Sequence, residues 1–382
     1  MNFLIAPNAL KGSLSAFRAA AIISQSLKGI APDGATVLCP IADGGDGTLD
    51  CLVQATGGKI FHVNVQGPIF SLRVNSRWGS LGDGRTAVIE IAEAAGLRLL
   101  SPSQFDVANA TTYGVGELIL TAMRAGFRKI IIGLGGSATN DGGAGCARAL
   151  GVIFFDEHNK ELPEGGIHLG RLHHLEIKNY ELGMKNAEIV ALSDVTNVLC
   201  GPEGAAFTFA AQKGASKEIV TKLDEAMKHY ASMIEREMNR TIATTPGSGA
   251  AGGLGAGLMA FCNATIVSGI DYVLDSVRFD TMLQQCDYVI TAEGMIDSQT
   301  LRGKGIEGVA RRARKFKKPV HAFVGRVHGN AVELQKKLEL ASLNQISPAT
   351  MSTEDAMKNA ESLLGVGVRD FFFSNFAMHS TK

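Results

Sequence analysis

Several features that would place a protein in a common functional class are missing from this sequence. No apolar run approaches the about 18 residues of a membrane-spanning helix, so we expect no such helix. The 37 basic and 37 acidic residues cancel, and no basic stripe stands out beyond residues 311–318. Nucleic-acid binding therefore has no electrostatic basis.

The cysteines and the N-terminal residues also exclude two possibilities. The six cysteines form no Cys-x-x-Cys pair and lie mostly among apolar residues, which indicates reduced, buried thiols. The apolar residues 1–7 are too short for a secretion signal and predict a strand. We therefore expect a soluble cytoplasmic protein.

Three catalytic motifs are absent as well. The sequence contains no Gly-x-x-x-x-Gly-Lys-Ser/Thr, no Gly-x-Ser-x-Gly and no His-Glu-x-x-His. These absences argue against a P-loop nucleotide site, a serine hydrolase elbow and a zinc protease helix.

Glycine, by contrast, is abundant: 45 of 382 residues, with only 10 prolines and no repeat. The length suggests two domains, and 46% hydrophobic residues indicate a globular protein. Apolar runs alternate with helical patterns at both chain ends, which predicts a doubly wound, flavodoxin-like parallel sheet built from residues 1–60 and 281–382. Shorter alternating runs in between predict an inserted α/β domain over residues 61–280 with a mixed sheet, and a cleft between the two domains as the active site.

The most informative segment covers residues 133–145, where six glycines surround short polar residues after an apolar run. Such a loop exposes backbone N–H groups with few Cβ atoms in the way, as phosphate-binding loops do. We predict that it binds the phosphates of a nucleotide through Gly135, Gly136, Ser137, Asn140, Asp141, Gly142 and Gly143.

Three further apolar runs end in a carboxylate, at Asp43, Asp194 and Glu293. In open α/β sheets ligands bind beyond the carboxyl ends of the strands, so acids at these positions can hold a metal ion or accept a proton. Each of them could instead only cap the following helix. Asp46 follows Asp43 across two glycines, an electronegative turn that suits Mg²⁺.

Lysines accompany these acids in loops of similar composition. Lys11 and Ser13 lie at a predicted strand-to-helix turn that suits an anion. Asn197 and Lys213 follow Asp194, while Asp297 and Lys304 follow Glu293. The glycine-rich segment 247–253 carries no charge, so close packing explains it as well as function does.

A dinucleotide site is the main alternative. Gly133-x-Gly135-x-x-Ala138 follows a predicted strand, and Asp156 ends the next apolar run, which matches a loose Rossmann fingerprint. However, the helix should begin directly after the third small residue, whereas residues 139–143 are polar and rich in glycine.

Six of these motifs, between Ala6 and about Val309, resemble those of the bacterial type 1 glycerate kinases. The resemblance implies a two-domain α/β enzyme that transfers the γ-phosphoryl group of ATP to a hydroxyl of D-glycerate, in most members the 2-hydroxyl. The sequence departs from the family motifs at Asn8, where the family has Asp, and at Met295, where it has Arg.

From these arguments together we predict a cytoplasmic kinase, with ATP as co-substrate, Mg²⁺ as cofactor and a small hydroxy acid as substrate. It acts as a monomer or homodimer, with no nucleic acid or membrane partner. The predicted catalytic residues are Lys11 and Asp194, the substrate-binding residues Ser13, Asp43, Asn197 and Lys213, and the metal ligands Asp46, Glu293 and Asp297. Lys304 is predicted to bind phosphate alongside the loop of residues 135–143. The predicted alternatives are a kinase for another small hydroxy acid and a dinucleotide-dependent oxidoreductase.

Overall fold

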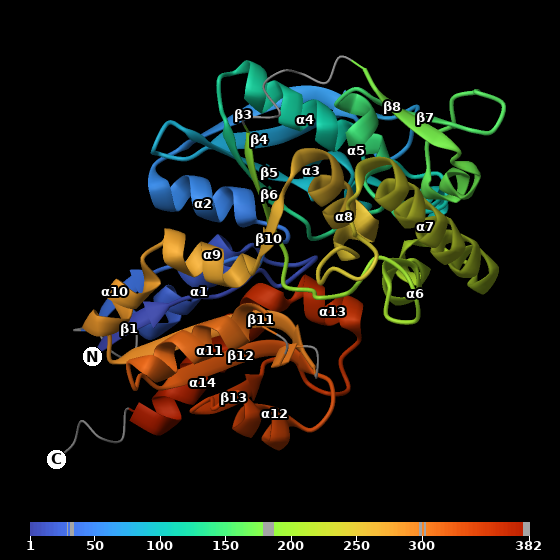
Figure 1. Cartoon of the computed structure of the whole chain (residues 1–382). Coiled ribbons are helices and arrows are strands. Elements are labelled where there is room, and N and C mark those ends of the chain that lie inside the picture. Colours follow the sequence, from blue (N-terminus) through green and yellow to red (C-terminus); the bar gives the residue numbers. More distant parts are fainter. Residues whose placement is uncertain (29, 31–33, 179–186, 298–299, 302, 377–382) are drawn as a thin grey trace. The chain divides into compact units, whose positions relative to one another are not determined.

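The computed structural model describes residues 1–28, 30, 34–178, 187–297, 300–301 and 303–376. Its contacts divide the chain into two compact units (Figure 1). Unit 1 combines Met1–Asp43 with Ile270–Lys382, and unit 2 covers Gly44–Gly269. The sequence analysis placed these boundaries at residues 60/61 and 280/281 instead. Whether each part folds as an independent domain stays a prediction.

Unit 1 contains one five-stranded sheet made from both ends of the chain, as predicted. In Figure 1 its N-terminal strands are blue and its C-terminal strands orange to red. The order is β13-β12-β11-β1-β2, and every neighbouring pair is parallel. This is the flavodoxin-like order 2-1-3-4-5. The strands are β1 (Asn2–Ile5), β2 (Ala35–Leu38), β11 (Tyr288–Ile296), β12 (Val320–Val327) and β13 (Ser342–Gln345).

Helices pack on this sheet because successive strand residues point to opposite faces. Phe3 and Ile5 of β1 belong to a buried cluster with residues of α1 and α14, whereas β1 and β11 also contact α10 and α11. The helices are α1 (Ala16–Lys28), α10 (Phe279–Gln285), α11 (Gly305–Lys315), α12 (Ala331–Lys337), α13 (Thr353–Lys358) and α14 (Ala360–Phe376), while α9 (Gly269–Ser276) begins at the last residue of unit 2.

Unit 2 contains the predicted mixed sheet, in the order β10-β9-β6-β5-β4-β3. The pairs from β10 to β5 are parallel, and those from β5 to β3 are antiparallel. The strands are β3 (Lys59–Gln66), β4 (Arg73–Ser80), β5 (Thr86–Glu90), β6 (Lys129–Gly133), β9 (Glu188–Leu192) and β10 (Thr265–Val267). A separate antiparallel pair consists of β7 (Val152–Phe155) and β8 (His174–Ile177).

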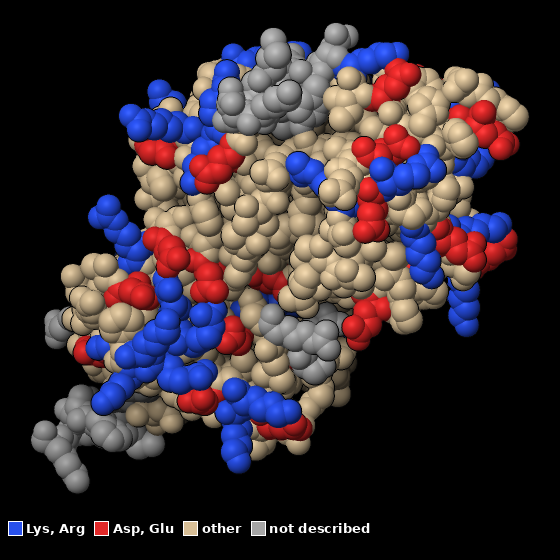
Figure 2. Space-filling model, in the orientation of Figure 1, with Lys and Arg blue, Asp and Glu red and all other residues tan. Residues whose placement is uncertain are grey.

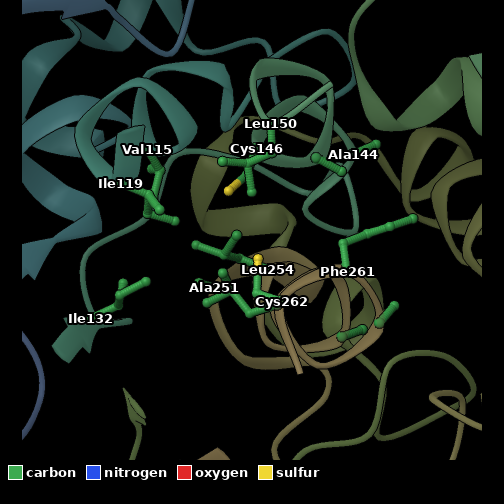
Figure 3. Close-up of a cluster of buried hydrophobic side chains, with 14 of the residues drawn as sticks. Val115, Ile119, Ile132, Ala144, Cys146, Leu150, Ala251, Leu254, Phe261 and Cys262 are labelled. Atoms are coloured by element: carbon green, nitrogen blue, oxygen red, sulfur yellow. The ribbon is translucent and has the colours of Figure 1, made fainter. Parts of the chain in front are cut away.

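The core of unit 2 lies where its helices meet the sheet. Figure 3 shows side chains of α4, α5 and α8 converging with Ile132 of β6, and the thiols of Cys146 and Cys262 lie among them. The helices are α2 (Thr48–Thr56), α3 (Ile91–Ala94), α4 (Tyr113–Arg124), α5 (Ala144–Ala149), α6 (Ala205–Phe209), α7 (Lys217–Met238) and α8 (Ala250–Cys262), with short 3₁₀ turns at Leu97–Leu99, Pro102–Gln104, Gly166–Arg171 and Ala211–Lys213. The long helix α7 packs through one stripe, whose Leu223, Met227 and Tyr230 are buried.

Charged side chains on the surface are largely paired where the sequence is most basic. Figure 2 shows Lys and Arg side chains gathered at the position of α11, with Asp and Glu beside them. Arg311 pairs with Asp271 and Glu307, and Arg312 pairs with Asp275 and Asp280. These ion pairs neutralise much of the one basic stripe of the sequence.

Two further expectations concern cysteines and membranes. None of the six cysteines, all in the described part of the chain, takes part in a disulfide. Five of them are buried, and burial raises the pKa of the Cys39 and Cys262 thiols to about 12. A search of the described helices found none with both the length and the apolar character needed to cross a membrane.

Candidate functional site

In unit 1, the predicted residues meet at the point where the strand order of the sheet reverses. The chain leaves β1 and β11 toward opposite sides there, which opens a crevice at the carboxyl ends of these two strands. The loop after β1 carries Lys11 and Ser13, and β11 carries Glu293. Gly294 lets the two segments approach, because a Cβ on it would lie 3.3 Å from the backbone nitrogen of Lys11.

A pocket of about 330 Å³ occupies this crevice. Its charged lining consists of Lys11, Asp43, Glu293, Lys304 and Arg326, and its apolar wall includes Leu10, Met295, Ile346 and Met357. Ligand pockets commonly measure about 300–1,000 Å³, so this volume suits a small molecule. The structure thus brings together five of the predicted residues, Lys11, Ser13, Asp43, Glu293 and Lys304.

The cationic and hydroxyl side chains of this pocket are placed by local backbone structure. Lys11 is exposed beside Gly12, whose φ of 77° favours glycine. Ser13 is committed to the turn, since its hydroxyl donates to the carbonyl of Leu10 at 2.9 Å. Lys304 is the residue that precedes the first turn of α11.

Glu293 is the most perturbed carboxyl group of the pocket. Burial, and then the nearby charge of Asp43, raise its pKa to about 8, although Lys11 and Lys304 act in the opposite direction. Its Oε2 atom is buried, and no hydrogen-bond partner for it lies among the described residues. A buried carboxylate oxygen without a partner is costly, so this side chain must hold a proton or contact a cation.

Asn8 was not among the predicted site residues, yet it positions Asp43. Asn8 is 2% exposed, and its amide donates to Asp43 Oδ2 at 3.2 Å. A carboxylate at position 8 would face Asp43 with like charge, whereas the amide can donate. With asparagine at position 8, Asp43 therefore has a hydrogen-bond donor as its neighbour, where the family motif would place a second acid.

Asp297 does not line the pocket. Its Oδ1 accepts from the backbone N–H of Thr300 at 3.2 Å, and the Thr300 hydroxyl lies 3.2 Å from the Asp297 nitrogen. Asp297 thus takes part in the turn after β11, and its charge also raises the pKa of Glu293. Its role as a metal ligand stays a prediction.

In unit 2, the glycine-rich loop after β6 packs directly against the turn that follows Asp43. Gly135 donates to the carbonyl of Gly44 at 3.0 Å, and a Cβ on Gly135 would lie 2.4 Å from Gly45 Cα. Gly136 has a φ of 79° and lies beside the Asp46 carboxylate. Glycine at 135 and 136 is therefore required by the close approach of the two loops.

The second half of this loop is held by Asp141. Asp141 is 1% exposed, and its carboxylate accepts from the hydroxyl and N–H of Thr112 and from the N–H groups of Gly143 and Gly145 at 2.8–3.1 Å. Gly142 and Gly143 both have positive φ. These bonds favour a structural role for Asp141 over the predicted contact with a phosphate.

Lys213 reaches the same loop from the turn after α6. It is 3% exposed, and its ammonium donates to Ser137 Oγ and to the carbonyl of Thr139, both at 2.7 Å. Burial lowers its pKa to about 7. The structure therefore places Lys213 with the predicted nucleotide residues of unit 2.

Several buried polar side-chain atoms of residues 139–140 and 248 have no partner within the described residues. They are both side-chain polar atoms of Asn140, the Thr139 hydroxyl and the Ser248 hydroxyl. The uncharged segment 247–253 contributes by close packing, because a Cβ on Gly252 would lie 1.9 Å from the Thr139 carbonyl. Unpaired buried donors and acceptors are what a polar ligand would satisfy.

Asp46 belongs to an acidic network that the sequence analysis missed. Arg98 lies 3.7 Å from Asp46 Oδ1 and also pairs with Glu93, and Arg77 contacts the same oxygen of Glu93. Glu90 is buried nearby and accepts from the Leu49 N–H at 2.6 Å; burial raises its pKa to about 8. Asp46 is in unit 2 and Glu293 in unit 1, so a shared metal site stays a prediction.

Asp194 lies just after β9, as predicted, and its carboxylate contacts the segment that follows β10. Its Oδ1 accepts from Ser268 Oγ at 3.1 Å and from the Gly269 N–H at 2.8 Å. The amide of Asn197, which is predicted to bind substrate, donates to the Glu203 carbonyl and the Thr208 hydroxyl. Asp194 therefore ties β9 to the segment after β10, and its catalytic role stays a prediction.

We expect Asp194→Asn to reduce turnover by at least about a hundredfold while the melting temperature stays unchanged, because asparagine keeps the accepting oxygen and removes only the charge. Asp194→Ala is the matched control for the structural role, since it removes the acceptor and should cost about 0.5–2 kcal/mol of stability. Turnover and melting temperature are measured on both variants. Full activity in Asp194→Asn would contradict a catalytic role.

Some of the site residues that were not predicted do follow a recognisable sequence pattern. Glu90 ends the apolar run of β5 and obeys the same strand-end rule as the three predicted acids. Arg326 follows the apolar run of β12 in the same way. Thr139 and Ser248 gave no comparable signal, because their importance depends on burial without partners.

The dinucleotide alternative lacks its structural context. Residues 134–143 separate β6 from α5, so no helix begins after the third small residue. Asp156 follows β7, which pairs with β8 outside the mixed sheet instead of forming the second strand of a βαβ unit. The geometry that a Rossmann fingerprint requires is therefore not formed here.

Comparisons with known proteins agree with this geometry. The model of the glycerate kinase family matches residues 3–372. A glycerate 2-kinase from Escherichia coli (strain K12) is 40% identical, covering 97% of this chain and 100% of the relative. A glycerate kinase from Bacillus subtilis (strain 168) is also 40% identical, over 97% and 96% of the two chains.

A solved structure is similar over the whole chain as well. A crystal structure from Salmonella typhimurium LT2, assigned as glycerate kinase 2, has a TM-score of 0.82 and 40% identity, covering 100% of this chain and 99% of that one. Together with the family match and the relatives, it shows that this chain is an enzyme of the glycerate kinase family.

Proposed function

We propose that this enzyme transfers the γ-phosphoryl group of ATP to the 2-hydroxyl of D-glycerate and releases 2-phospho-D-glycerate. The observation that carries the proposal is the match along nearly the entire chain to proteins named glycerate kinase and, in one case, glycerate 2-kinase. Kinases need positioned phosphates, a cation that neutralises them and a held acceptor hydroxyl. The two clusters of polar residues supply candidates for each part.

The glycine-rich loop of unit 2 is our candidate for the phosphates of ATP. Gly135, Gly136, Gly142 and Gly143 keep its backbone open, while Ser137 and Asn140 offer polar side chains. Lys213 supplies a positive charge at the same place, held by Ser137 and Thr139. An anion beside this buried ammonium would offset the desolvation that lowers its pKa.

The pocket of unit 1 is our candidate for the hydroxy acid. Lys11 and Lys304 would attract an anionic substrate, and the volume of about 330 Å³ suits a molecule as small as glycerate. Lys11 is our candidate catalytic residue here. An active site in a cleft between the two predicted domains stays a prediction.

Glu293 and Asp43 fit a divalent cation. Mg²⁺ prefers one or two carboxylates and keeps its other positions for water and phosphate. Glu293 has a buried oxygen without a described partner, beside a second carboxylate that raises its pKa. When bound, Mg²⁺ would neutralise charge on the phosphates. No cluster of three or more metal-ligating side chains occurs among the residues described, so one or two acids would have to suffice.

Phosphorus NMR of a reaction with ATP, Mg²⁺ and a panel of small hydroxy acids tests the proposal. We expect D-glycerate to be the best acceptor and the new phosphate ester to lie on its 2-hydroxyl. A different preferred acid would redirect the proposal to another hydroxy-acid kinase. A 3-phosphate product would overturn the assignment of the acceptor hydroxyl.

Thermal unfolding with nucleotides separates a kinase from an oxidoreductase. A ligand that binds only the folded state stabilises it by about 2.7 kcal/mol at a hundredfold excess over Kd. We expect ATP with Mg²⁺ to raise the melting temperature and NADH to leave it unchanged. Stabilisation by NADH without a response to ATP would contradict the proposed function. A cytoplasmic location and a monomeric or homodimeric state stay predictions.

A further inference from the structure

The pocket of unit 1 contains one cationic side chain, Arg326, that was not among the site residues predicted from the sequence. Arg326 lies near the carboxyl end of β12 and lines the pocket together with Lys11 and Lys304. It is half-buried, and within the described ranges it forms no ion pair with an acid. Arginine is always charged, so a partly buried guanidinium in this position needs an anion from elsewhere.

The register of the sheet places Arg326 directly beside Met295. β11 and β12 run parallel, and Met295 pairs with Arg326 between the pairs Glu293–Val324 and Ile296–Val327. Paired residues of neighbouring strands point to the same face of a sheet. Met295 is 49% exposed and lines the same pocket. An arginine on either of these two positions would therefore present its guanidinium to the same wall.

A hydrogen bond to the segment after β13 orients the side chain of Arg326. One of its terminal nitrogens donates to the carbonyl of Met351. Ser347, from the same connection after β13, donates to the carbonyl of Gly325 and also lines the pocket. A guanidinium has five N–H donors, so most of them stay available for a planar, two-oxygen acceptor.

The charges of the pocket favour an anion at this wall. Its lining carries three permanently or normally cationic side chains, Lys11, Lys304 and Arg326, against the two acids Asp43 and Glu293. Asp43 and Glu293 act on one another electrostatically, and Lys11 and Lys304 act on Glu293. Within the described residues, Arg326 forms no ion pair with either of these acids, which leaves it available to a ligand.

We propose that Arg326 binds the carboxylate of the hydroxy-acid substrate and so determines the preference for acids over neutral alcohols. This inference deepens the proposed function and rests on it. The carboxylate suits a guanidinium better than an ammonium, because two parallel N–H groups match its two oxygens. The apolar wall around Arg326 strengthens the interaction by lowering the local dielectric.

The test compares Arg326→Met with the wild type, using D-glycerate and its neutral amide as acceptors. We expect the KM for D-glycerate to rise by about 10- to 100-fold, the KM for ATP to stay within about twofold, and the preference for the acid over the amide to be lost. Arg18→Met is the matched control, because Arg18 is an exposed arginine of unit 1 that pairs with Glu361 and does not line the pocket. It should leave all three quantities unchanged.

Because Arg326 also contacts Met351, a second variant separates charge from structure. Met295→Arg combined with Arg326→Met returns a guanidinium to the paired position without the contact to Met351. We expect it to recover at least about a third of the lost preference for the acid. No recovery would contradict the proposal, since a structural role alone would then explain Arg326→Met.

Two other outcomes would overturn it. An unchanged KM for D-glycerate in Arg326→Met would remove Arg326 from substrate binding, and a rise in the KM for ATP alone would assign it to the nucleotide. If the wild type phosphorylates D-glycerate in either case, only this inference fails. If the wild type phosphorylates no hydroxy acid, the proposed function fails with it.

Discussion

Replacement of Lys213 by methionine is expected to reduce kcat/KM by about a thousandfold and, at pH 7, to raise the melting temperature. The loss of activity follows from removing a positioned charge beside the loop proposed to bind phosphate, a change that costs about 10²–10³ in comparable electrostatic sites. The gain in stability follows from the burial of this ammonium, which has hydrogen bonds to Ser137 and Thr139 but no ion pair in the described chain. Replacement of a lysine with a purely structural role would not be expected to lower the activity and raise the melting temperature together.

The pH dependence of this stability gain has a definite sign. The pKa of Lys213 is about 7 in the folded protein, against an ordinary value of 10.5. Between these values the unfolded chain binds more protons, so the stability of the wild type rises with pH. The penalty for burying the charge is complete below pH 7 and disappears above pH 10.5. The advantage of Lys213→Met should therefore be largest at pH 6, at most about 5 kcal/mol, and vanish in strongly alkaline buffer.

Melting curves from pH 6 to pH 10 and steady-state kinetics on the same preparations check both parts. Lys222→Met is the control, because Lys222 is an exposed lysine of α7 that pairs with Glu218. It should change neither quantity. Normal kinetics in Lys213→Met would remove this lysine from the phosphate site, and a lower melting temperature at pH 6 would contradict the penalty assigned to its burial.

The fold could be predicted from the sequence largely because its strands are apolar runs bounded by glycine-rich turns. The runs at residues 2–6 and 320–324 are β1 and the first part of β12, and the parallel pairing of the chain ends follows from the alternation with helices. The unit boundaries were harder to place. Asp43 and Gly44 lie in one continuous glycine-rich turn, so no change in composition marks the point where the chain passes from one unit to the other.

Residues of the candidate site could be predicted from the sequence only where they lie at the carboxyl ends of strands. Lys11, Asp43 and Glu293 follow β1, β2 and the first half of β11, and the parallel sheet brings them to one pocket. Asp297 also directly follows a strand, β11, but its carboxylate accepts from Thr300 and it does not line the pocket, so its role as a metal ligand stays a prediction. Lys213 was assigned to the substrate, because the sequence does not reveal that the turn after α6 reaches Ser137. Such contacts depend on tertiary packing, which local patterns do not encode.

Glu293→Gln is expected to abolish the response to Mg²⁺ and to reduce kcat by about a thousandfold, while making the protein more stable at alkaline pH. Glutamine keeps the shape of the side chain but cannot become the anion that Mg²⁺ requires. Removing one electrostatic interaction of this kind commonly costs about 10²–10³ in turnover. Without Mg²⁺, the charge on the phosphates would also no longer be neutralised.

The stability effect follows from the raised pKa of Glu293, about 8 in the folded protein against an ordinary value of 4.5. Between these values the folded protein binds more protons than the unfolded chain, so wild-type stability falls as the pH rises. The penalty is absent below pH 4.5 and complete above pH 8, where it amounts to at most about 5 kcal/mol. Glu293→Gln carries no such penalty. Its melting temperature should match the wild type at pH 4.5 and exceed it at pH 9.

In the wild type, the protonation of Glu293 should also affect the binding of Mg²⁺. If Mg²⁺ binds the Glu293 carboxylate as proposed, it competes there with a proton, so Mg²⁺ should bind more tightly as the pH rises toward 8 and release protons when it binds. Calorimetry at pH 6 and pH 8.5, in two buffers of different ionisation enthalpy, measures the affinity and the number of protons released. Glu361→Gln, an exposed acid of α14 that pairs with Arg18, is the control and should behave as the wild type. Mg²⁺ affinity that is independent of pH, or that survives in Glu293→Gln, would place the metal elsewhere and leave Glu293 as a buried, protonated acid.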